Sequence, residues 1–176
     1  MSLSPARKNR ATFVAALTGP LLTGVARVVL GLLWINEGLI KYRAGFGAAD
    51  IQLVVDSASA NSRVPAFFQS FAGSVLGGSP DFFGVVMPLL EVGLGVVLVL
   101  GVLTLPATLM SVLTLMTYWL ADQLTASYPV MVALAVVVAT WALAASRFSV
   151  TELVEQAVRR RRPTSVWQRE PVRRWL

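Results

Sequence analysis

The chain has neither cysteine nor histidine among its 176 residues. Without cysteine it cannot form disulfides, thiolate–metal sites or iron–sulfur clusters, and it cannot hold a covalent sulfur intermediate. Without histidine it lacks an imidazole for haem ligation or for general acid–base catalysis. We therefore expect no metal and no covalent cofactor in this chain, and we assign any metal or flavin chemistry to a partner protein.

Charged residues are also scarce, at 14% of the chain, whereas 56% of the residues are hydrophobic. A soluble domain carries about 25% charged residues. In lipid, helices satisfy their own backbone hydrogen bonds. The composition therefore predicts an all-α integral membrane protein that forms one compact bundle in the lipid bilayer.

The long apolar runs predict four transmembrane helices when they are read with a window of about 20 residues. We place the four-span membrane domain at 20–151, with spans at about 20–42, 82–103, 107–124 and 129–146. Only Thr104–Pro106 separates the second span from the third, which predicts a tight antiparallel hairpin. Pro106 suits the first turn of the third helix.

The segment 43–81 lies on the outer side of this arrangement and is long for a plain loop. Residues 56–62 are polar and indicate a turn, whereas Val64–Leu76 is apolar and aromatic but too short to span a membrane. This second stretch predicts a short interfacial helix. It can serve as a membrane-surface helix, as a lid over a site or as a docking surface. A short amphipathic helix is predicted at Val150–Val158.

Basic residues gather at both ends of the chain. Arg7, Lys8 and Arg10 precede the first span, and eight Arg against three acids follow from Arg147 onward. By the positive-inside rule, the basic N-terminus at 1–19 and the basic tail at 152–176 face the cytoplasm. We therefore predict a multi-pass protein of a bacterial-type plasma (inner) membrane.

The net charge of +6 has the same origin. We expect the basic tail to contact anionic lipid, and we expect no nucleic-acid partner. The basic N-terminus resembles the start of a signal peptide, but the apolar run continues to Ile40 with no A-x-A-like cleavage site. We interpret it as a retained first span.

Small and charged residues form a stripe along the first span. Gly24, Gly31 and Gly38 recur every seven residues on one helical face, where small residues let helices approach closely in lipid. Arg27, Trp34 and Lys41 lie on the same side. Glu37 precedes Lys41 by four residues, so these two can pair.

The second and third spans also carry polar faces. Glu91 lies on one face with Gly84, Pro88 and Gly95, and Tyr118 and Asp122 share a face of the third span with Thr108 and Ser111. An ionised side chain in hydrocarbon costs at least ~2.5 kcal/mol, so these groups should face the bundle interior. Arg27 is a possible partner for Glu91 if both side chains reach. The candidate site residues are Arg27, Trp34, Glu37, Lys41, Glu91, Tyr118 and Asp122.

Two interpretations of this polar group remain open. In one, the charges only hold the helices together. In the other, they line a pocket for a polar head group such as a quinone. A buried carboxylate can pass a proton when a quinone is reduced or oxidised, and a cation can stabilise the quinone oxygens.

Three segments resemble the signatures of the DoxX/DoxD family. Arg27–Trp34 with Glu37-Gly38 and Lys41 is similar to "R-x-x-L-G-x-x-F/W … G-x-x-K" in its first span, and Glu91–Thr104 to "E-x-x-x-G … L-G-x-x-T" in its second. Ala145–Thr151 resembles its closing "G-x-G-R-x-S-L-D", with Ala and Ser in place of the glycines and Thr151 in place of the Asp.

The resemblance covers about residues 26–151 and implies a four-helix membrane subunit. DoxD-type members of that family form part of a thiosulfate:quinone oxidoreductase, and others associate with membrane redox or detoxification assemblies. The positions that carry over are Arg27, Glu37, Lys41 and Glu91. The lack of cysteine and histidine argues against a self-contained thiosulfate oxidase.

We accordingly expect a membrane subunit of a quinone-linked oxidoreductase or respiratory assembly that works with other membrane or redox subunits. The alternative is a non-catalytic accessory subunit whose interior charges are structural. A small transporter ranks third, because four spans are few and no pair of broken helices occupies corresponding repeats.

Overall fold

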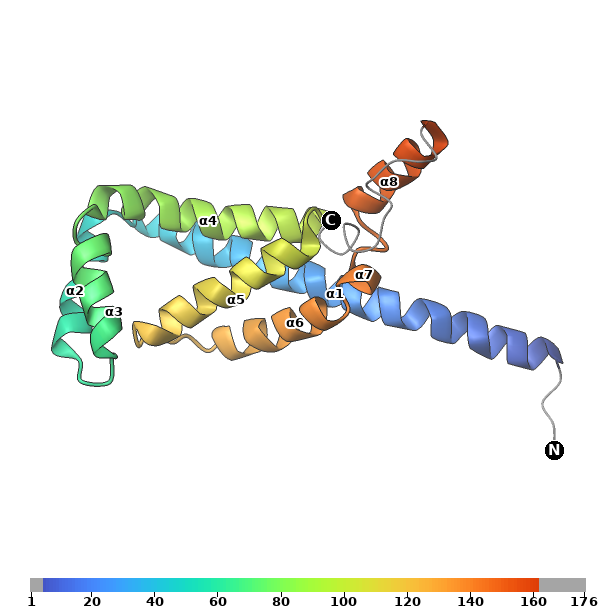
Figure 1. The fold of residues 1–176 in the computed structure, drawn as a ribbon, viewed down its shortest axis with the longest axis horizontal. Coiled ribbons are helices and arrows are strands. Elements are labelled where there is room, and N and C mark those ends of the chain that lie inside the picture. The colour runs from blue at the N-terminus through green and yellow to red at the C-terminus, as the bar shows by residue number, and fades with distance from the viewer. Residues whose placement is uncertain (1–4, 162–176) are drawn as a thin grey trace.

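Four helices of the computed structural model, which describes residues 5–161 and side chains from 18 to 157, pack together as a bundle (Figure 1). Helix α1 lies against α4 and α6, and α5 completes the ring by packing against α4 and α6. Within the described range the chain forms helices and turns but no strand. The predicted all-α class is therefore confirmed. The bundle helices are α1 (Pro5–Ala44), α4 (Pro80–Leu100), α5 (Thr104–Leu120) and α6 (Tyr128–Thr140).

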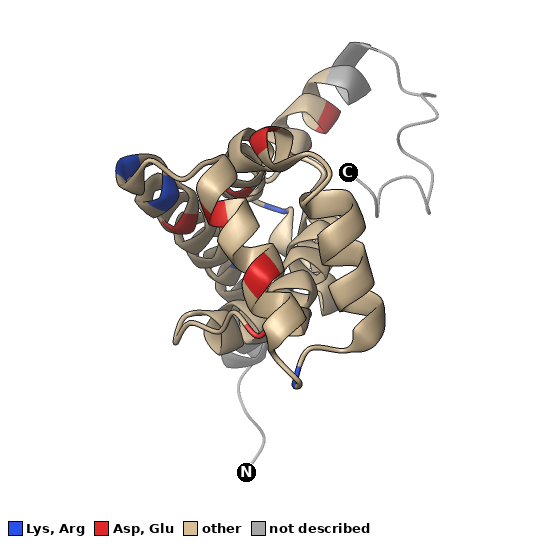
Figure 2. Cartoon of the chain, turned by 90° about the vertical axis from the view of Figure 1, so that its left-hand side faces the viewer, with Lys and Arg blue, Asp and Glu red and all other residues tan. Residues whose placement is uncertain are grey.

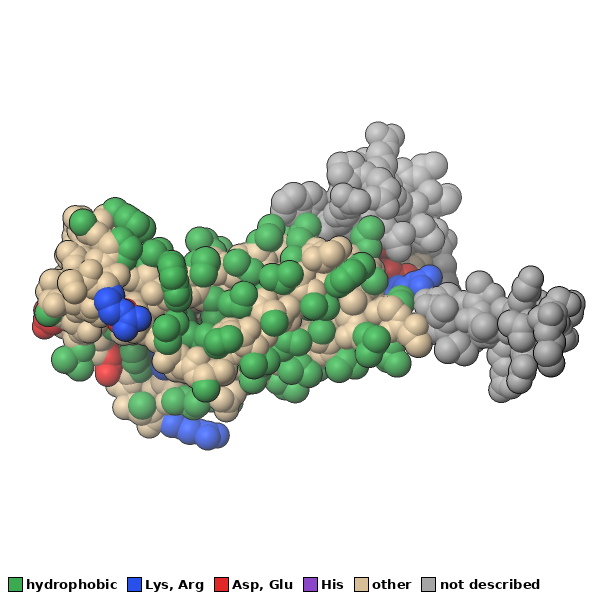
Figure 3. Space-filling view, turned by 90° about the horizontal axis from the view of Figure 1, so that it is seen from below, with side chains coloured by type: hydrophobic (Ala, Val, Ile, Leu, Met, Phe, Trp, Pro, Cys, Tyr) green, Lys and Arg blue, Asp and Glu red, His purple; other side chains and the backbone are tan. Residues whose placement is uncertain are grey.

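Two of these helices are long and apolar enough to cross a membrane, Thr18–Ala44 within α1 and Pro80–Leu100. Only 33% of each apolar window is buried inside the protein, so most of both helices faces outward. Helices α5 and α6 are apolar but shorter, with 17 and 13 residues. Figure 3 shows apolar side chains along the whole bundle, and the Lys and Arg side chains visible on that face lie near its two ends.

Helices α4 and α5 start and end a few residues earlier than the second and third spans predicted from the sequence. The hairpin link is 101–103 instead of Thr104–Pro106, because Gly101 (φ 70°) and Leu103 (φ 49°) both adopt left-handed backbone there. Pro106 lies in the first turn of α5, as predicted. Helix α6 ends at Thr140 because the backbone of Trp141 leaves the helical region, and α7 (Ala142–Ala145) follows.

A helical cap covers one end of the bundle. It consists of α2 (Ala48–Ala60), α3 (Ala66–Phe71) and the π-helical segment η1 (Ala72–Leu76). The helix predicted at Val64–Leu76 is confirmed in position, and the turn predicted at 56–62 is largely wrong. Helix α2 continues to Ala60 because its apolar face buries Ile51 and Ala58 in a second hydrophobic core. Figure 2 looks at the bundle from this capped end.

The opposite end of the bundle holds the α4–α5 hairpin, α7 and α8 (Val150–Arg161) (Figure 1). The amphipathic helix predicted at Val150–Val158 is thus confirmed and extends three residues further. Helix α1 also begins toward this end, so the described parts of the N- and C-terminal segments lie on the same side of the bundle (Figure 1). The rest of the predicted basic tail, beyond Arg161, lies outside the described residues.

Candidate functional site

Helices α1 and α4 meet through glycines, and this close contact positions the polar residues. A Cβ atom at Gly31 would lie 2.7 Å from the Gly95 carbonyl oxygen, and one at Gly38 would lie 2.9 Å from the Pro88 carbonyl oxygen. No side chain fits at either place without displacing the backbone opposite. Gly24, the third member of the predicted stripe, is looser, with its nearest atom at 3.9 Å. The close approach brings Lys41 of α1 beside Glu91 of α4.

Lys41, Glu91 and Tyr118 form the polar centre of the bundle. The Lys41 Nζ lies 2.6 Å from Glu91 Oε1, and the Tyr118 hydroxyl donates to the same oxygen at 2.5 Å. The Glu91 side chain is 0% exposed and that of Lys41 is 19% exposed. The second oxygen, Glu91 Oε2, is buried and has no hydrogen-bond partner in the described part of the chain. The carboxylate therefore keeps one free acceptor in the protein interior.

Aromatic rings hold this centre in place. Tyr118 stacks on Tyr128 of α6 with 5.5 Å between ring centroids and lies 6.5 Å from the ring of Trp34. Trp34 is fully buried, and its Nε1 donates to Ser111 Oγ at 2.6 Å. The Lys41 Nζ also lies 5.3 Å from the centroid of the Tyr118 ring, within cation–π range. All four bundle helices thus contribute to this cluster.

Glu37 and Lys41, which could pair along α1, do not do so. Lys41 turns to Glu91 on the neighbouring helix, and Glu37 accepts a hydrogen bond from Ser127 Oγ at 2.9 Å. A pair at i,i+4 on one helix contributes only about 0.2–0.5 kcal/mol to stability. Leaving the fully buried Glu91 without a cation would cost more, about 3–5 kcal/mol, so Lys41 pairs with Glu91.

The possible contact between Arg27 and Glu91 does not form. Arg27 is buried toward the other end of the bundle, where it donates to the Leu98 and Val99 carbonyls of α4. It donates further to Ala145 at 3.0 Å and Phe148 at 3.2 Å. A cation is favoured at the C-terminal end of a helix, where the carbonyls have no partner within the helix. Arg27 therefore ties three segments of the bundle together.

Asp122 lies apart from the Lys41 cluster, just after the end of α5. One of its oxygens lies 3.2 Å from Arg63 Nη2, and the other accepts from Asn61 Nδ2 at 2.8 Å. Both partners belong to the turn between α2 and α3. Of the seven sequence candidates, the structure brings Trp34, Lys41, Glu91 and Tyr118 together, and it separates Arg27 and Asp122 from them. Glu37 is held at the start of α6 through Ser127.

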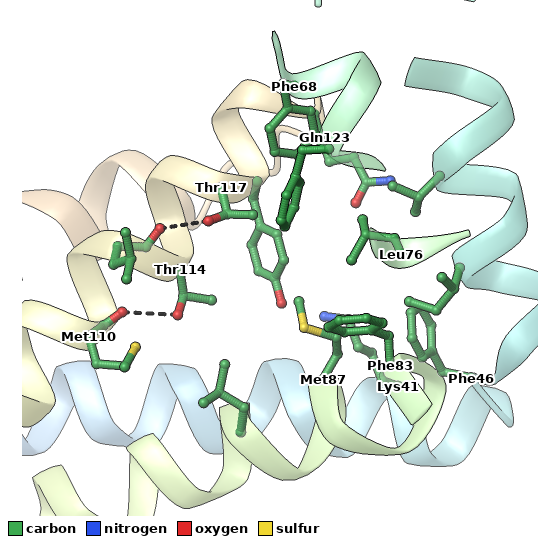
Figure 4. A pocket seen from close by; sticks show the side chains of 17 residues that line it. Lys41, Phe46, Phe68, Leu76, Phe83, Met87, Met110, Thr114, Thr117 and Gln123 are labelled. Atoms are coloured by element: carbon green, nitrogen blue, oxygen red, sulfur yellow. Dashed lines mark hydrogen bonds between the residues drawn. The ribbon is translucent and has the colours of Figure 1, made fainter. Parts of the chain in front are cut away.

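A pocket of about 230 Å³ lies between the cap and helices α4 and α5, next to the Lys41 cluster (Figure 4). Lys41 and Tyr118 border it on the bundle side, and Phe68, Phe71 and Leu76 border it from the cap. Its lining is mostly apolar. The hydroxyls of Thr114 and Thr117 donate to carbonyls of their own helix at 2.9 Å, so their protons are not available to a ligand in the pocket. The pocket therefore offers polar groups mainly through Lys41, Tyr118 and Gln123.

Only part of this lining was predictable from the amino-acid pattern. Phe68 and Phe71 belong to the aromatic stretch that was predicted to lie over the bundle, and their spacing of three residues was the available signal. Phe46, Phe83 and Met87 were missed. They lie at the junctions of the cap with α1 and α4, and their sequence surroundings resemble any apolar helix end.

The chemistry of the cluster is that of charge-assisted hydrogen bonding and proton transfer. An ammonium group has three donors, one of which meets Glu91, so Lys41 can also donate to a ligand oxygen in the pocket. No group of three or more His, Cys, Asp or Glu residues with metal-ligating geometry occurs among the described residues.

The chain matches no protein-family model, and comparison with curated proteins and with solved structures gives no match either.

Proposed function

We propose that this chain is a four-span membrane protein of the DoxX type that binds the head group of a quinone in the pocket under the cap and serves a quinone-linked oxidoreductase or respiratory assembly. One observation carries the proposal. The apolar pocket has Lys41 and Tyr118 at its wall, and both of them bond to the fully buried Glu91 behind it.

The four-span topology rests on helix length and on the distribution of charge. At 1.5 Å per residue, α5 is about 26 Å long and α6 about 20 Å, which α7 extends toward the ~30 Å of a hydrocarbon core. The start of α1 and the α7–α8 segment lie at one end of the bundle and the cap lies at the other (Figure 1). An even number of crossings follows, and the basic residues near both termini favour the cytoplasmic side for that end.

The pocket suits a head group whose apolar tail stays in the lipid. Its volume of about 230 Å³ is below the ~300–1,000 Å³ that encloses a drug-sized ligand. Met110 and Leu113 line it and are also exposed on the outer surface of α5. A tail can therefore leave between the cap and α5 into the membrane, while the head group meets Lys41 and Tyr118.

The buried pair gives the pocket a proton acceptor. Oxidation of a quinol to a quinone releases two electrons and two protons. The chain has no cysteine or histidine to ligate a metal redox centre, so we assign the electrons to a partner subunit. Glu91 can take one of the two protons on its free oxygen, relayed by the Tyr118 hydroxyl, and the other leaves to water at the membrane interface. Lys41 can donate to the quinone oxygen, and the Tyr118 hydroxyl, whose own proton goes to Glu91, can accept from the quinol. The resemblance to the DoxX family includes Lys41 and Glu91, and it supports the role of this pair at a quinone site.

A second candidate function is that of a non-catalytic accessory subunit. It is favoured by the bonds of Lys41 and Tyr118 to Glu91 Oε1, which pair the buried charge within the bundle itself. In this case the cluster only fixes the packing of α1, α4 and α5, and a larger partner supplies the activity.

Quinone occupancy tests the two functions against each other. The protein is purified in mild detergent from membranes that contain quinone, and bound quinone is extracted and quantified per chain. We expect the double variant Lys41→Met/Tyr118→Phe to lose at least about tenfold in occupancy, because two hydrogen bonds of about 1 kcal/mol each are removed from the head group, one donated by Lys41 and one accepted by Tyr118 from the quinol hydroxyl.

Thr140→Val is the matched control, since its hydroxyl bonds only to Val136 of its own helix at the other end of α6. It should keep the occupancy of the unmodified protein. Equal occupancy in all three proteins, or no quinone in any of them, would contradict the quinone proposal. A large partner that co-purifies in fixed ratio with a quinone-free chain would favour the accessory function.

A further inference from the structure

Helix α8 is tied to the bundle at its start. The hydroxyl oxygen of Ser149 accepts from the backbone N–H of Glu152 at 3.2 Å and so caps the helix. Thr151 Oγ1 donates to the carbonyl of Gly101, in the α4–α5 hairpin, at 2.8 Å. Beyond this first turn, no helix in the described part of the chain packs along α8, which projects from the end of the bundle opposite the cap (Figure 1). The bundle therefore fixes where α8 begins and leaves its later turns uncovered.

One side of α8 is apolar and exposed. At 100° per residue, a single side of the helix carries Val150, Leu153, Val154 and Ala157. Leu153 is 66% exposed and Val154 is 55% exposed, although both are large apolar residues. Apolar residues on one side of a helix are stabilised when an apolar partner or medium removes them from water. The later turns of α8 thus present a surface that suits such a partner.

The charges of α8 suit an anionic surface. Glu152 and Glu155 lie on the side of the helix opposite Leu153 and Val154, so they point away from whatever the apolar side contacts. The last residues of the helix are the basic run Arg159–Arg161. An apolar side combined with a basic end is typical of helices that lie in the interface of a membrane.

The end of the bundle where α8 begins has further features of a membrane interface. Trp141, which directly precedes α7, is 55% exposed, and tryptophan is enriched where a membrane span meets the lipid head groups. Helix α1 also begins toward this end, and the sequence there contains Arg7, Lys8 and Arg10 (Figure 1). Anionic lipid attracts basic segments of this kind. These features favour a lipid surface as the partner of α8.

We propose that α8 is a membrane-surface anchor that inserts Leu153 and Val154 into an anionic lipid leaflet at the end of the bundle opposite the cap. Its apolar side enters the boundary between head groups and acyl chains, and its basic end is attracted to the charge of the lipid. The anchor rests on the membrane topology of the proposed function, but it does not depend on the quinone. Charge alone predicts lipid contact for the basic tail, whereas the structure adds an exposed apolar side and a fixed point of attachment.

The absence of native cysteine allows single spin labels to report the depth of α8 in the membrane. Val154→Cys and Gln156→Cys place the label on the apolar and on the polar side of the helix, because two residues correspond to about 200°. The full-length protein is placed in nanodiscs of phosphatidylcholine with or without phosphatidylglycerol. Collision rates with oxygen and with a water-soluble nickel complex then give the depth of each label. With phosphatidylglycerol present, we expect the label at position 154 in the lipid and that at position 156 in water.

Removal of the basic end tests the electrostatic part of the anchor. Arg159→Gln/Arg160→Gln/Arg161→Gln should lower the ratio of inserted to water-exposed α8 at least about tenfold, because each basic residue near an anionic surface contributes about fivefold to the attraction. Pure phosphatidylcholine should lower the same ratio in the protein that keeps its arginines. Arg43→Gln removes an exposed cation from the end of α1 near the cap and should leave the depth of α8 unchanged.

A label at Leu32, in the middle of α1 and 55% exposed, separates failure of the anchor from failure of the topology. If Leu32→Cys lies in hydrocarbon while Val154→Cys stays in water in both lipids, the apolar side of α8 belongs to a protein partner and the anchor is overturned. An inserted α8 whose depth is insensitive to the arginines and to the lipid charge would equally overturn its selection of anionic lipid. If Leu32→Cys is also in water, the membrane topology itself is wrong.

Discussion

Substitution of Lys41 and Glu91, singly and together, tests whether the two residues form a coupled ion pair that stabilises the bundle. We consider three proteins: Lys41→Met, Glu91→Gln and the double variant. Methionine keeps the length of the lysine side chain and removes its charge, and glutamine keeps the oxygen that accepts from Tyr118. In Lys41→Met, the buried Glu91 retains only the Tyr118 hydroxyl. In the double variant no unpaired charge remains.

The expected magnitudes follow from burial. Breaking a buried pair by removing one partner costs about 3–5 kcal/mol, whereas replacing both partners is often close to neutral. Glu91 is 0% exposed, so Lys41→Met should lower the free energy of unfolding by about 3 kcal/mol. Lys41 is 19% exposed and can turn toward solvent, so Glu91→Gln should cost about 2 kcal/mol. The double variant should cost about 2 kcal/mol, which gives a coupling energy of about 3 kcal/mol.

The assay is equilibrium unfolding in mixed detergent micelles, followed by far-ultraviolet circular dichroism because the fold is helical. Arg43→Met is the control, since it removes an exposed cation two residues further along the same helix and should change stability by at most about 0.5 kcal/mol. Additive losses, with the double variant about 5 kcal/mol less stable than the unmodified protein, would refute the coupled pair.

Two further predictions concern the framework of the bundle. Gly95→Ala should destabilise the protein by about 1–3 kcal/mol, because its Cβ would lie 2.6 Å from the Gly31 carbonyl oxygen. Gly93→Ala on the same helix has no atom within 4 Å and should stabilise it by up to about 1 kcal/mol, so changes of the same sign in the two unfolding curves would contradict the glycine contact. Arg27→Lys should cost about 3 kcal/mol, because one ammonium cannot replace the bonds to both α4 and α7 and at least two charge-assisted bonds are lost. A thermal unfolding midpoint that equals that of an exposed Arg43→Lys control would show that Arg27 does not hold these segments together.

Much of the fold was predictable from local pattern. Composition indicated an apolar helical protein, and runs of about 20 apolar residues placed the ends of α4 and α5 to within four residues. Helix α1 begins earlier than its predicted span, and α6 ends earlier. Glycine spacing identified the side of α1 that meets α4, because a seven-residue repeat stays on one helical face. One error was the end of α2, where polar serines concealed an apolar face at Ile51 and Ala58. That face is recognised only from the packing of Ile51 and Ala58 in the core of the cap.

The candidate site was predictable as a set of residues but not as a set of pairs. Sequence alone predicted that Lys41, Glu91 and Tyr118 face the interior, because helical periodicity fixes the face of each residue and the surface of a predicted membrane span would expose a charge to hydrocarbon. Tertiary structure decided which groups meet. The depth at which α1 contacts α4, set by Gly31 against Gly95, brings Lys41 to Glu91 and leaves Arg27 among the carbonyls at the other end. Hydrogen bonds act over about 3 Å, whereas periodicity places a residue only on a face, so the partner of each charge depended on the packing of the helices.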